Sequence, residues 1–381
     1  MLRMTPPRVV RRVLPTRTTA RTEGCAACSD TVRVVPSARP AVDVVAPVAG
    51  DAALVRAVLA RLRGLERRDG DTVTVVDNRG VGVEDPDVLV ATAVRTSYHA
   101  RNRGAARGTA PWLLFLDADV DPPADLLDRL FSPVPGEHVG VLAGAVRDSD
   151  PGPRGTAAER YAHLKSSMSQ ETTLARDRGR FAFAQTANAA VRRSAFVVVG
   201  GFREEVRSGG DADLCFRLAA AGWALERRPD AAVVHRNRTT VRAMLGQRFR
   251  HGTGAAWLAA EHPGALPARR WPGLLAWGVR RAGAGVRAGL RGDRDAALVG
   301  LLDGPAVWAF ELGRRVPNRE LPAAGRARRG GASAPGGPGG PGGPGEAQAP
   351  DGPPEARDGD GPPPGHGPGP GPGPDPDPDG Q

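Results

Sequence analysis

The sequence predicts an α/β fold, in which a mostly parallel sheet carries helices on both of its faces. Short β-branched or apolar runs alternate with amphipathic segments from residue 42 onward. One of these runs, WLLFL at 112–116, is wholly apolar and is therefore typical of a buried central strand. Two runs end directly in carboxylates, at Asp77 and at Asp117. Open α/β sheets bind their ligands at the carboxyl ends of strands.

The first half of the sheet region shows the alternation most clearly. Residues 53–65 place leucine and valine on one face and arginine on the other, which indicates an amphipathic helix. Ser97 is a suitable N-cap for a second helix over 98–107. Valine-rich or apolar runs predict the strands between these helices, at 42–48, 72–76, 88–90 and 112–116.

The second half continues the pattern with smaller residues. Pro122 and Asp125 stand where helix starts prefer proline and acidic side chains. Gly222 ends a helix over 212–221. Further helices are expected over 156–170 and 240–261. The later strands are expected at 139–146, 182–191, 223–227 and 231–234.

Composition restricts the folded part of the chain to residues 39–320. Of the 381 residues, those from 321 to 381 are dominated by Gly, Pro, Asp and Ala, which predicts a disordered tail. Residues 1–38 are basic and lack periodicity, so we expect a poorly ordered N-terminal segment. Between them we expect a sheet domain over 39–240 and a helical region over 241–320.

The end of the helical region leaves two interpretations open. Residues 271–315 carry arginine and tryptophan in a broadly amphipathic pattern. Such a segment is compatible with a membrane surface, and equally with a packed helical appendage. The chain contains no run of about eighteen apolar residues, so we predict no transmembrane helix.

The charge and cysteine content exclude several classes of protein. The net charge is +10, but the arginines are scattered and aromatic residues make up only 4% of the chain, which argues against nucleic-acid binding. A basic surface still suits phosphate substrates or anionic lipid. Cys25 and Cys28 form a lone C-x-x-C without a second pair, and Cys215 lies among apolar residues. The chain is therefore no disulfide scaffold, and a reducing cytoplasm is expected.

Carboxylates and one histidine indicate a metal and phosphate site. Asp117, Asp119 and Asp121 follow the central strand at once, and hard oxygen ligands of this kind suit Mg²⁺ or Mn²⁺ bound to a phosphate ester. His235 ends a later strand, so it is expected at the same edge of the sheet. The alternatives are a solvated acidic turn and a structural histidine.

Two further groups are candidates for catalysis and anion binding. Asp211 follows the small residues 208–210 at the start of a helix, where it is either an N-cap or a general base. Asp213 does not share its helical face. Arg248 and Arg250 point in different directions, and one of them suits a diphosphate. The alternative for these arginines is a solvated basic face.

With these residues in view, the stretch 42–251 resembles the family 2 inverting glycosyltransferases, which have a GT-A fold. The order and spacing of several stretches carry the resemblance: VVAPV (44–48), VTVVDN (73–78), ARNRGAARG (100–108), LLFLDADV (113–120), ANAAVRRSAF (187–196), VGGF (199–202) and GGDADLCFRLAAAGWALERRPDAAVVH (209–235). The run QRFRHGTGAAWLAAEHPGAL (247–266) is similar, more narrowly, to the mycofactocin-type glycosyltransferases of actinobacteria.

The resemblance implies a role for each matched residue. It implies that Asp77 contacts the base of a nucleotide donor, that Asp117 contacts its ribose, and that Asp211 is the catalytic base. Mn²⁺ or Mg²⁺ is then held by Asp119 and His235. The remaining implied contacts are Pro47 and Arg101 for the nucleotide, Asn188 and Trp223 for the acceptor, and Gln247, Arg248 and Arg250 for the diphosphate.

Three positions depart from the family pattern. Gly210 stands where the family usually has Glu, which leaves the base in place but changes how it is oriented. Residues 78–80, Asn-Arg-Gly, replace the more usual Asp-Gly-Ser turn. His251 stands where some members have Trp, which argues against a processive grip on the acceptor.

The prediction is therefore a metal-dependent inverting glycosyltransferase. It moves a sugar from a nucleotide-diphosphate sugar, with a UDP-sugar expected, to a hydroxyl of a glycan, peptide-derived or lipid acceptor. We expect a cytoplasmic enzyme, with peripheral contact to the inner face of the plasma membrane left open. Two alternatives remain: a phosphohydrolase of the haloacid dehalogenase type with Asp117 as nucleophile, and a sugar-nucleotide-binding relic without activity, which Gly210 keeps open.

Overall fold

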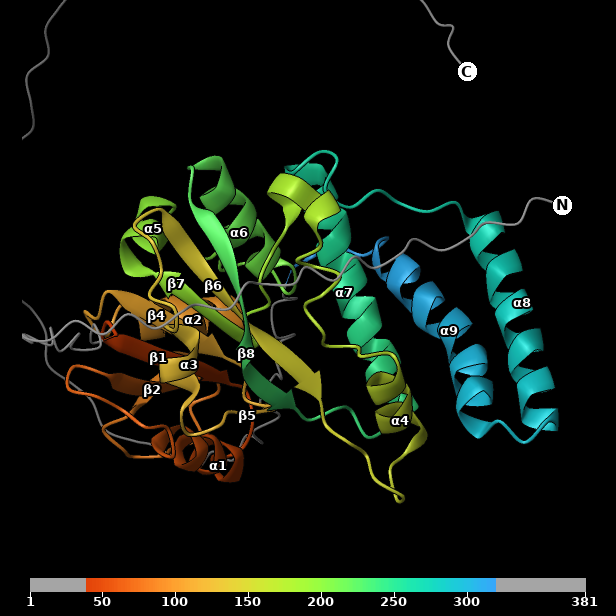
Figure 1. The fold of residues 1–381 in the computed structure, drawn as a ribbon, viewed down its shortest axis with the longest axis horizontal. Helices are drawn as coiled ribbons and strands as arrows, with labels where there is room; N and C mark the ends of the chain where they lie inside the picture. The colour runs from red at the N-terminus through yellow and green to blue at the C-terminus, as the bar shows by residue number, and fades with distance from the viewer. Residues whose placement is uncertain (1–38, 320–381) are drawn as a thin grey trace, which may run out of the picture. The chain divides into compact units, whose positions relative to one another are not determined.

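The computed structural model describes residues 39–319, all of which belong to one compact unit. The predictions made for residues 1–38, with Cys25 and Cys28, and for the tail 321–381 lie outside the described residues. Within the described range the predicted α/β class is confirmed, since helices surround a single sheet (Figure 1).

The sheet is mixed rather than uniformly parallel. Its order is β3-β2-β1-β4-β7-β6-β8-β5, and four of its seven pairings are parallel. β7 runs antiparallel to both of its neighbours, and the short β5 runs antiparallel to β8. The strands are β1 (Val42–Val48), β2 (Thr72–Asp77), β3 (Val88–Val90), β4 (Trp112–Leu116), β5 (Val120–Asp121), β6 (Val139–Asp148), β7 (Asn188–Arg192) and β8 (Ala224–His235).

Helices cover both faces of the sheet, as predicted. Side chains alternate along each strand, so Trp112, Leu114 and Leu116 of β4 join one hydrophobic core and Leu113 and Phe115 join the other. The first core also takes residues of α1 (Ala52–Arg63) and α3 (Leu126–Leu130). The second takes residues of α2 (Ser97–Ala105), α5 (Arg193–Val198) and α6 (Gly210–Ala220).

Two predicted boundaries differ from the structure: α2 starts one residue earlier than predicted, and the helix predicted over 156–170 ends earlier. Thr96 caps α2 instead of Ser97, because its hydroxyl accepts the amide of His99 at 3.1 Å. The helix predicted over 156–170 is α4 (Ala157–Leu164), which stops before Ser166, a residue with φ of 45°. Beyond it Gln170 turns inward and is buried, with its amide on the carbonyl of Gly144.

The strand predictions around residues 182–234 also need correction. Only residues 188–192 of the predicted strand 182–191 pair, as β7, because the residues before Asn188 form a turn. The two short strands predicted at 223–227 and 231–234 are one strand, β8, interrupted in its register against β6. The irregularity contains Pro229, which has no N–H to donate to a neighbouring strand, so the chain bulges there and resumes.

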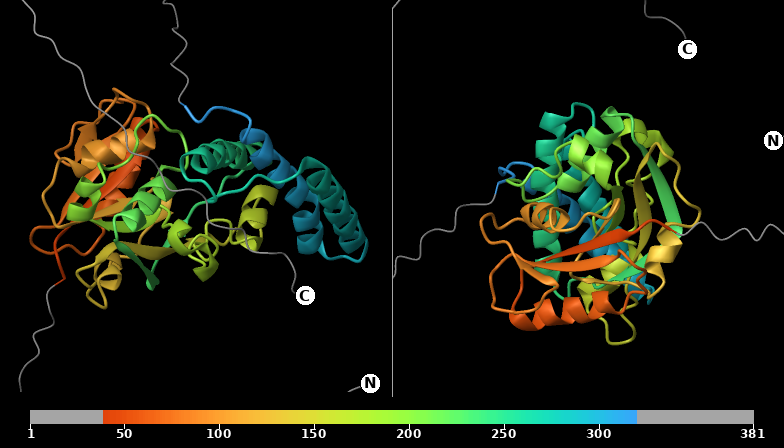
Figure 2. Two further views of the ribbon diagram at one scale, coloured as in Figure 1. Left: turned by 90° about the horizontal axis from the view of Figure 1, so that it is seen from above. Right: turned by 90° about the vertical axis from the view of Figure 1, so that its left-hand side faces the viewer.

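Three helices follow the sheet and pack on one another with little space between them. They are α7 (Val241–Glu261), α8 (Trp271–Leu290) and α9 (Arg294–Gly313). A Cβ at Gly252 of α7 would lie 1.9 Å from the carbonyl oxygen of Phe310 in α9, so the two backbones touch. Figure 2 shows α8 and α9 as a hairpin beside α7, on the side away from β1 and β2.

The membrane prediction needs one qualification from α9. Among the described residues, this helix alone is long and apolar enough to cross a membrane by length and composition, with a mean hydropathy of 1.3 over its best window. A third of that window is buried within the protein. The sequence prediction used a different criterion, an unbroken apolar run, and α9 does not meet it because Asp303, Gly304 and Pro305 interrupt its apolar residues.

Candidate active site

The pairing of β5 with β8 brings two predicted metal ligands together. Val120 pairs with His235, and the amide of Arg236 donates to the carbonyl of Asp119 at 2.8 Å. This places the Asp119 carboxylate, which follows β4, against the imidazole that ends β8. Asp119 Oδ2 and His235 Nε2 lie 3.5 Å apart.

This pair has the geometry of two ligands to one divalent cation. Two atoms that each lie about 2.1 Å from one ion are separated by at most about 4 Å, and the observed 3.5 Å fits. Among residues 39–319 no group of three potential ligands is found. Mg²⁺ and Mn²⁺ complete such a pair with water and substrate phosphates, so the residues present fit a cation that arrives with a phosphate.

Neighbouring groups orient the pair. The Nδ1 atom of His235 lies 3.2 Å from Asn237 Oδ1 and 4.0 Å from Asp148 Oδ1. That Asp148 oxygen is buried, and no hydrogen-bond partner for it lies among the described residues. Burial opposes the charge on Asp119, yet the hydrogen bond and charge of His235, with the charge of Arg238, lower the pKa of Asp119. Asn237 and Asp148, which lie beside Nδ1 of His235, are placed to set the orientation of its ring, as groups behind a ligating histidine do.

The predicted nucleotide contacts surround the same strand ends. Arg101 donates to Asp117 at 2.5 Å, and its guanidinium lies 5.5 Å from the ring of Tyr98. Burial raises the pKa of Asp117 even though Arg101 opposes the shift. Asp77 ends β2 beside β1, and its carboxylate accepts the amides of residues 79, 80 and 81 at 2.6–2.9 Å. Pro47 lies in β1 opposite Val76, next to Asp77.

Asp211 is the second residue of α6, and it faces the Asp117 side of the site. The helix begins after Gly209, whose φ of 85° suits glycine. Burial raises the pKa of the Asp211 carboxyl, and the charges of Arg101 and Asp117 both act on it. Asp213 is separate, as predicted, because it is buried against Arg217 at 2.7 Å and His262 at 2.9 Å.

The structure explains the glycine that precedes Asp211. A Cβ at Gly210 would lie 2.8 Å from the ring of Tyr98, closer than real contacts allow. Tyr98 is 6% exposed and stacks against Phe202, with ring centroids 5.5 Å apart. The tyrosine ring therefore fills the space that a larger residue at position 210 needs.

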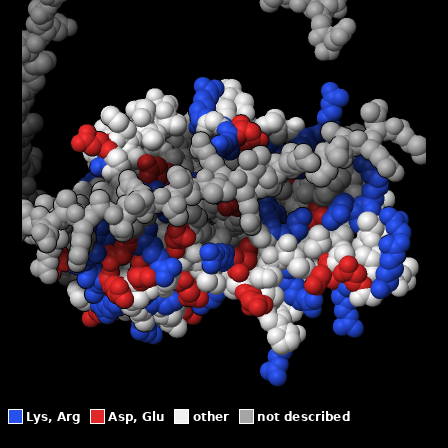
Figure 3. All heavy atoms as spheres, in the orientation of Figure 1, with Lys and Arg blue, Asp and Glu red and all other residues white. Residues whose placement is uncertain are grey.

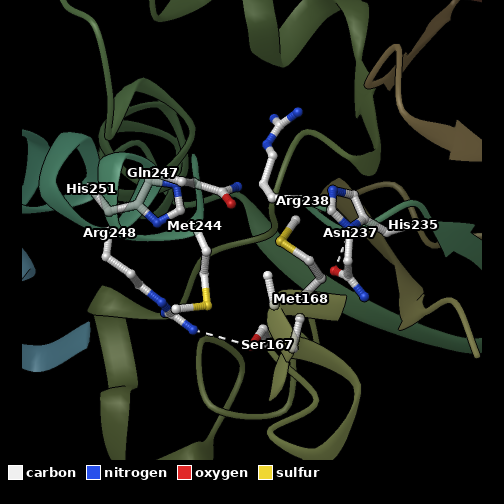
Figure 4. Close-up of a pocket in the computed structure, with 11 residues that line it drawn as sticks. Ser167, Met168, His235, Asn237, Arg238, Met244, Gln247, Arg248 and His251 are labelled. Carbon is white, nitrogen blue, oxygen red and sulfur yellow. Dashed lines mark hydrogen bonds between the residues drawn. The ribbon is translucent and has the colours of Figure 1, made fainter. Parts of the chain in front are cut away.

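Basic side chains of α7 lie on the other side of the metal pair. Figure 4 shows Gln247, Arg248 and His251 of α7 facing His235 and Arg238 across one small pocket. Arg248 donates to Ser167 Oγ at 3.1 Å. The pKa of His251 falls to about 3, because the residue is buried and lies beside Arg250, Arg248 and Arg238, so the imidazole is neutral.

Arg250 does not line this pocket, in keeping with its spacing from Arg248, but its charge interacts with those of Arg238 and Asp117. Burial lowers the pKa of Arg250, and the positive charges of Arg238 and Arg207 lower it further. Among the described residues no carboxylate forms an ion pair with it. Arg238 adds a further cation, since its guanidinium nitrogen Nη2 lies 3.2 Å from Asp119 Oδ2. Cations gathered in this way beside a buried strand edge suit a phosphate-bearing ligand.

Two predicted acceptor residues are placed elsewhere. Asn188 is fully buried, and its amide nitrogen donates to the carbonyls of Ala145 at 3.0 Å and Ala231 at 2.8 Å, where it bridges the irregularity between β6 and β8. Trp223 immediately precedes β8, at the opposite end from His235, and packs over Gly140. Neither side chain reaches the cluster of Asp119, His235 and Asp211.

Sequence reasoning also missed two residues of the site. Tyr98 was treated only as part of a helix, and nothing in its local sequence signals that its ring meets Gly210. Arg238 is not among the predicted site residues, although its position three residues after a strand-end histidine places it near the same ligand. The available signal was the Arg-Asn-Arg run at 236–238.

The chain belongs to the glycosyltransferase-like family 2, whose model matches residues 23–254. Pre-mycofactocin glycosyltransferases from two Mycobacterium tuberculosis strains, CDC 1551/Oshkosh and H37Rv, are each 32% identical to it over 251 residues, which cover 64% of this chain and 53% of theirs. Glycosyltransferase AglE from Haloferax volcanii is 32% identical over 168 residues, 44% of this chain and 53% of its own. The chain thus spans about half the length of these curated relatives.

Among solved structures, mannosyltransferase PcManGT from Pyrobaculum calidifontis in complex with GDP-Man and Mn²⁺ aligns over 74% of each chain, with a TM-score of 0.46 and 18% identity. The predicted family is thereby confirmed through the family model and the curated relatives. The alternative of a haloacid dehalogenase-type phosphohydrolase is set aside, because the matched region is that of a different family.

Proposed function

We propose that this protein transfers a sugar from a nucleotide-diphosphate sugar to an acceptor hydroxyl, with inversion at the anomeric carbon. The observation that carries the proposal is the meeting of Asp119 with His235 at 3.5 Å, beside Asp117 and within a group of arginines. This arrangement offers a place for a cation and a diphosphate at the carboxyl ends of β4 and β8. It agrees with the family to which the chain belongs.

The donor would lie along the edge formed by β1, β2 and β4. In the proposal Asp77 and Pro47 border the base, Arg101 and Asp117 border the ribose, and Asp119 and His235 hold Mn²⁺ or Mg²⁺. When bound, such a cation neutralises charge that develops on the leaving diphosphate. Gln247, Arg248 and Arg250, with Arg238, supply further positive or polar contacts for that leaving group.

Asp211 would take the proton of the acceptor hydroxyl. It stands at the start of α6, near Asp117 and therefore near the donor sugar. A raised pKa makes a carboxylate a better proton acceptor once it is ionised. In a single displacement the acceptor oxygen bonds to the anomeric carbon as the bond to the diphosphate oxygen breaks, and the proton moves to Asp211.

We propose a UDP-sugar as donor. We also propose an acceptor resembling that of the pre-mycofactocin glycosyltransferases, because these relatives align with 251 residues, 64% of this chain. A glycan or lipid hydroxyl is the other acceptor class to test. The location proposed is the cytoplasm, where nucleotide sugars are the available donors.

The first test is release of nucleoside diphosphate from a panel of nucleotide sugars, with and without Mn²⁺. We expect release from one donor only with metal present, and its loss in Asp119→Ala. Asp121→Ala is the matched control, because this side chain follows two residues later, pairs with Arg61 and Arg236 and is 46% exposed. Equal loss in both variants would contradict a specific role for Asp119.

The second test is the variant Asp211→Asn. We expect the variant to bind the donor with unchanged affinity and to lose transfer by roughly 10²–10⁴-fold, since it cannot accept the proton. Calorimetry with the donor and a transfer assay measure the two effects separately, and NMR of the wild-type product reports the anomeric configuration. A variant that transfers sugar at the wild-type rate would refute the base assignment. Donor binding without turnover by the wild type in every acceptor assay would indicate a relic.

A further inference from the structure

The chain just after α9 contacts the loop 206–210, which directly precedes Asp211. Asn318 lies just beyond α9 and is 7% exposed. Its Oδ1 atom accepts the amides of Arg207 at 3.2 Å and Ser208 at 3.1 Å, and its Nδ2 atom donates to the carbonyl of Ser208 at 2.8 Å. Next to it, Val206 and Arg319 form an antiparallel bridge.

Asn318 also joins this loop to α7. The hydroxyl of Thr253, which is buried, lies 3.1 Å from the same Oδ1 atom. One carboxamide therefore satisfies two loop amides, one loop carbonyl and a helix hydroxyl, and a buried backbone group without such a partner is costly. Asn318 and Ser208 are 110 positions apart in the sequence.

The rest of the loop has little freedom to move. A Cβ at Gly254 of α7 would lie 2.7 Å from the carbonyl carbon of Ser208, and a Cβ at Gly209 would lie 2.9 Å from Leu258. On the opposite side Gly210 meets the ring of Tyr98. The loop 206–210 is thus packed between α7 and α2, and Asn318 adds hydrogen bonds to the backbone of residues 207 and 208. Asp211 follows three residues after Ser208.

We propose that Asn318 is a positioning residue for the catalytic base, and that it acts by holding the backbone from which α6 starts. The inference rests on the proposed role of Asp211. Its consequence is that the described residues after α9, 314–319, are required for transfer, because Asn318 holds the backbone that leads to Asp211. An error of about 1 Å in a reacting group costs up to about 10²-fold in rate, so small loop movements would be visible in kcat.

The test compares full-length Asn318→Ala with Val316→Ala, a control in the same segment with a side chain that is 39% exposed. We expect kcat to fall by about ten- to a hundredfold in Asn318→Ala with the donor KM unchanged, and both constants to stay at wild-type values in Val316→Ala. Hydrogen exchange should rise in residues 205–212 of the first variant only. Asn318→Asp keeps the accepting oxygen and loses the donated hydrogen bond, so its kcat should lie between those of Asn318→Ala and the wild type.

A double variant separates a positioning role from a structural one. If Asn318 acts through Asp211, adding Asn318→Ala to Asp211→Asn should cause no further loss of the residual rate. Wild-type kcat in Asn318→Ala, or equal losses in the two backgrounds, would overturn the inference. Activity retained in Asp211→Asn would instead overturn the base assignment, so the two failures are distinguishable. A loss of kcat that only follows the fraction of folded protein, measured by circular dichroism, would also overturn it.

Discussion

At the scale of single residues, Asp211 is the group whose environment says most about mechanism. Burial raises the pKa of its carboxyl, the positive charge of Arg101 acts in the opposite direction, and the negative charge of Asp117 adds to the increase. Tyr98 and Cys215 lie close enough to feel the charge of Asp211, and both remain neutral because burial raises the pKa of each. The site therefore contains a carboxylate that ionises at higher pH than carboxyl groups usually do.

The first prediction concerns the pH dependence of kcat. A base works only when ionised, so kcat should fall as the pH drops through the raised pKa of Asp211, and the fall should begin above the usual carboxyl range near ~4. Arg101→Leu removes a charge that lowers this pKa, so the acidic limb should move to higher pH. Transfer at saturating donor, followed across pH, measures both curves. A limb that stays in place in Arg101→Leu would contradict the assigned environment.

The same pKa has a consequence for stability that needs no activity assay. The pKa of Asp211 is higher in the folded protein than in the unfolded chain, so protonated Asp211 favours the folded state. This contribution to stability is fully present below the usual carboxyl range. It is lost as the pH rises through the pKa of the folded protein. Asp211→Asn should therefore raise the melting temperature at neutral pH, and the difference should shrink in acid. Scanning calorimetry of both proteins across pH measures it. A lower melting temperature at neutral pH would show that the carboxylate stabilises the fold.

The second prediction concerns the contact between Gly210 and Tyr98. A methyl group at position 210 would meet the tyrosine ring at 2.8 Å, so Gly210→Ala should destabilise the protein by about 1–3 kcal/mol, the usual cost of overpacking. Denaturant unfolding measures this cost. In the background Tyr98→Ala, where the ring is absent, the same glycine substitution should cost much less. If Gly210→Ala destabilised both proteins equally, the cost would come from the backbone at position 210 and not from contact with Tyr98.

At the scale of elements, the crossing of α7 and α9 depends on two glycines. A Cβ at Gly252 would lie 1.9 Å from the carbonyl oxygen of Phe310, and one at Gly313 would lie 1.9 Å from that of Phe249. Both obstacles are backbone atoms, so the helices would have to separate. The helix α7 also contains Gln247, Arg248, Arg250 and Thr253. Its packing against α9 therefore sets the position of these side chains relative to the site.

The third prediction uses a control glycine in the same helix. Gly252→Ala should lower the free energy of unfolding by more than about 1 kcal/mol. Gly246→Ala should raise it by up to about 1 kcal/mol, because an added Cβ there meets nothing within 4 Å and alanine favours the helix. Urea unfolding of the two variants beside the wild type measures both signs. Destabilisation of equal size in the two variants would contradict the close crossing.

The junction of β5 with β8 is the second element that matters for function. β5 has only two residues, and their pairing with residues 234 and 235 is what sets Asp119 against His235. A strand so short has no period by which sequence analysis recognises it. The metal pair was therefore predicted from strand ends, whereas its geometry depends on a pairing across the chain.

At the scale of the whole molecule, charge is distributed unevenly. In Figure 3 acidic and basic side chains mix over the part that holds α1 and the strands β1 and β2, whereas basic side chains form a column along the edge where α8 lies. Within the site, Arg238 and Arg250 add to a chain whose net charge is +10. A positive potential of this kind draws an anionic donor toward the protein.

The fourth prediction follows from this potential. The KM for the nucleotide sugar should rise as NaCl is raised from about 0.05 to 0.5 M, because the Debye length falls from about 14 Å to about 4 Å over this range and attraction beyond that distance is screened. The KM for an uncharged acceptor should change much less, and that acceptor serves as the control. Initial rates at varied donor and salt measure both. Arg250→Gln should flatten the salt dependence, and an unchanged slope in that variant would exclude this arginine from donor attraction.

Local sequence patterns were enough to predict the α/β class, most of the longer helices and strands, and the residues worth testing. Amphipathic period, strand composition and carboxylates at strand ends are local properties, so the elements over residues 42–116 and the helices α6 and α7 were predicted close to their observed bounds, whereas α4 is shorter than predicted. The family resemblance rested on the same stretches, and it was confirmed. Roles for individual site residues, Asp211 above all, stay predictions.

The tertiary structure decided everything that depends on contact between distant parts of the chain. Only folding shows that β7 runs antiparallel, that β8 is one strand with a bulge, and that Asn188 and Trp223 pack away from the site. The same holds for Tyr98 against Gly210 and for Asn318 against Ser208. The physical reason is that such contacts arise from packing and hydrogen bonding between residues far apart in the chain, 43 positions for Asn188 and Ala145 and 110 for Asn318 and Ser208, and these contacts leave no period in the sequence.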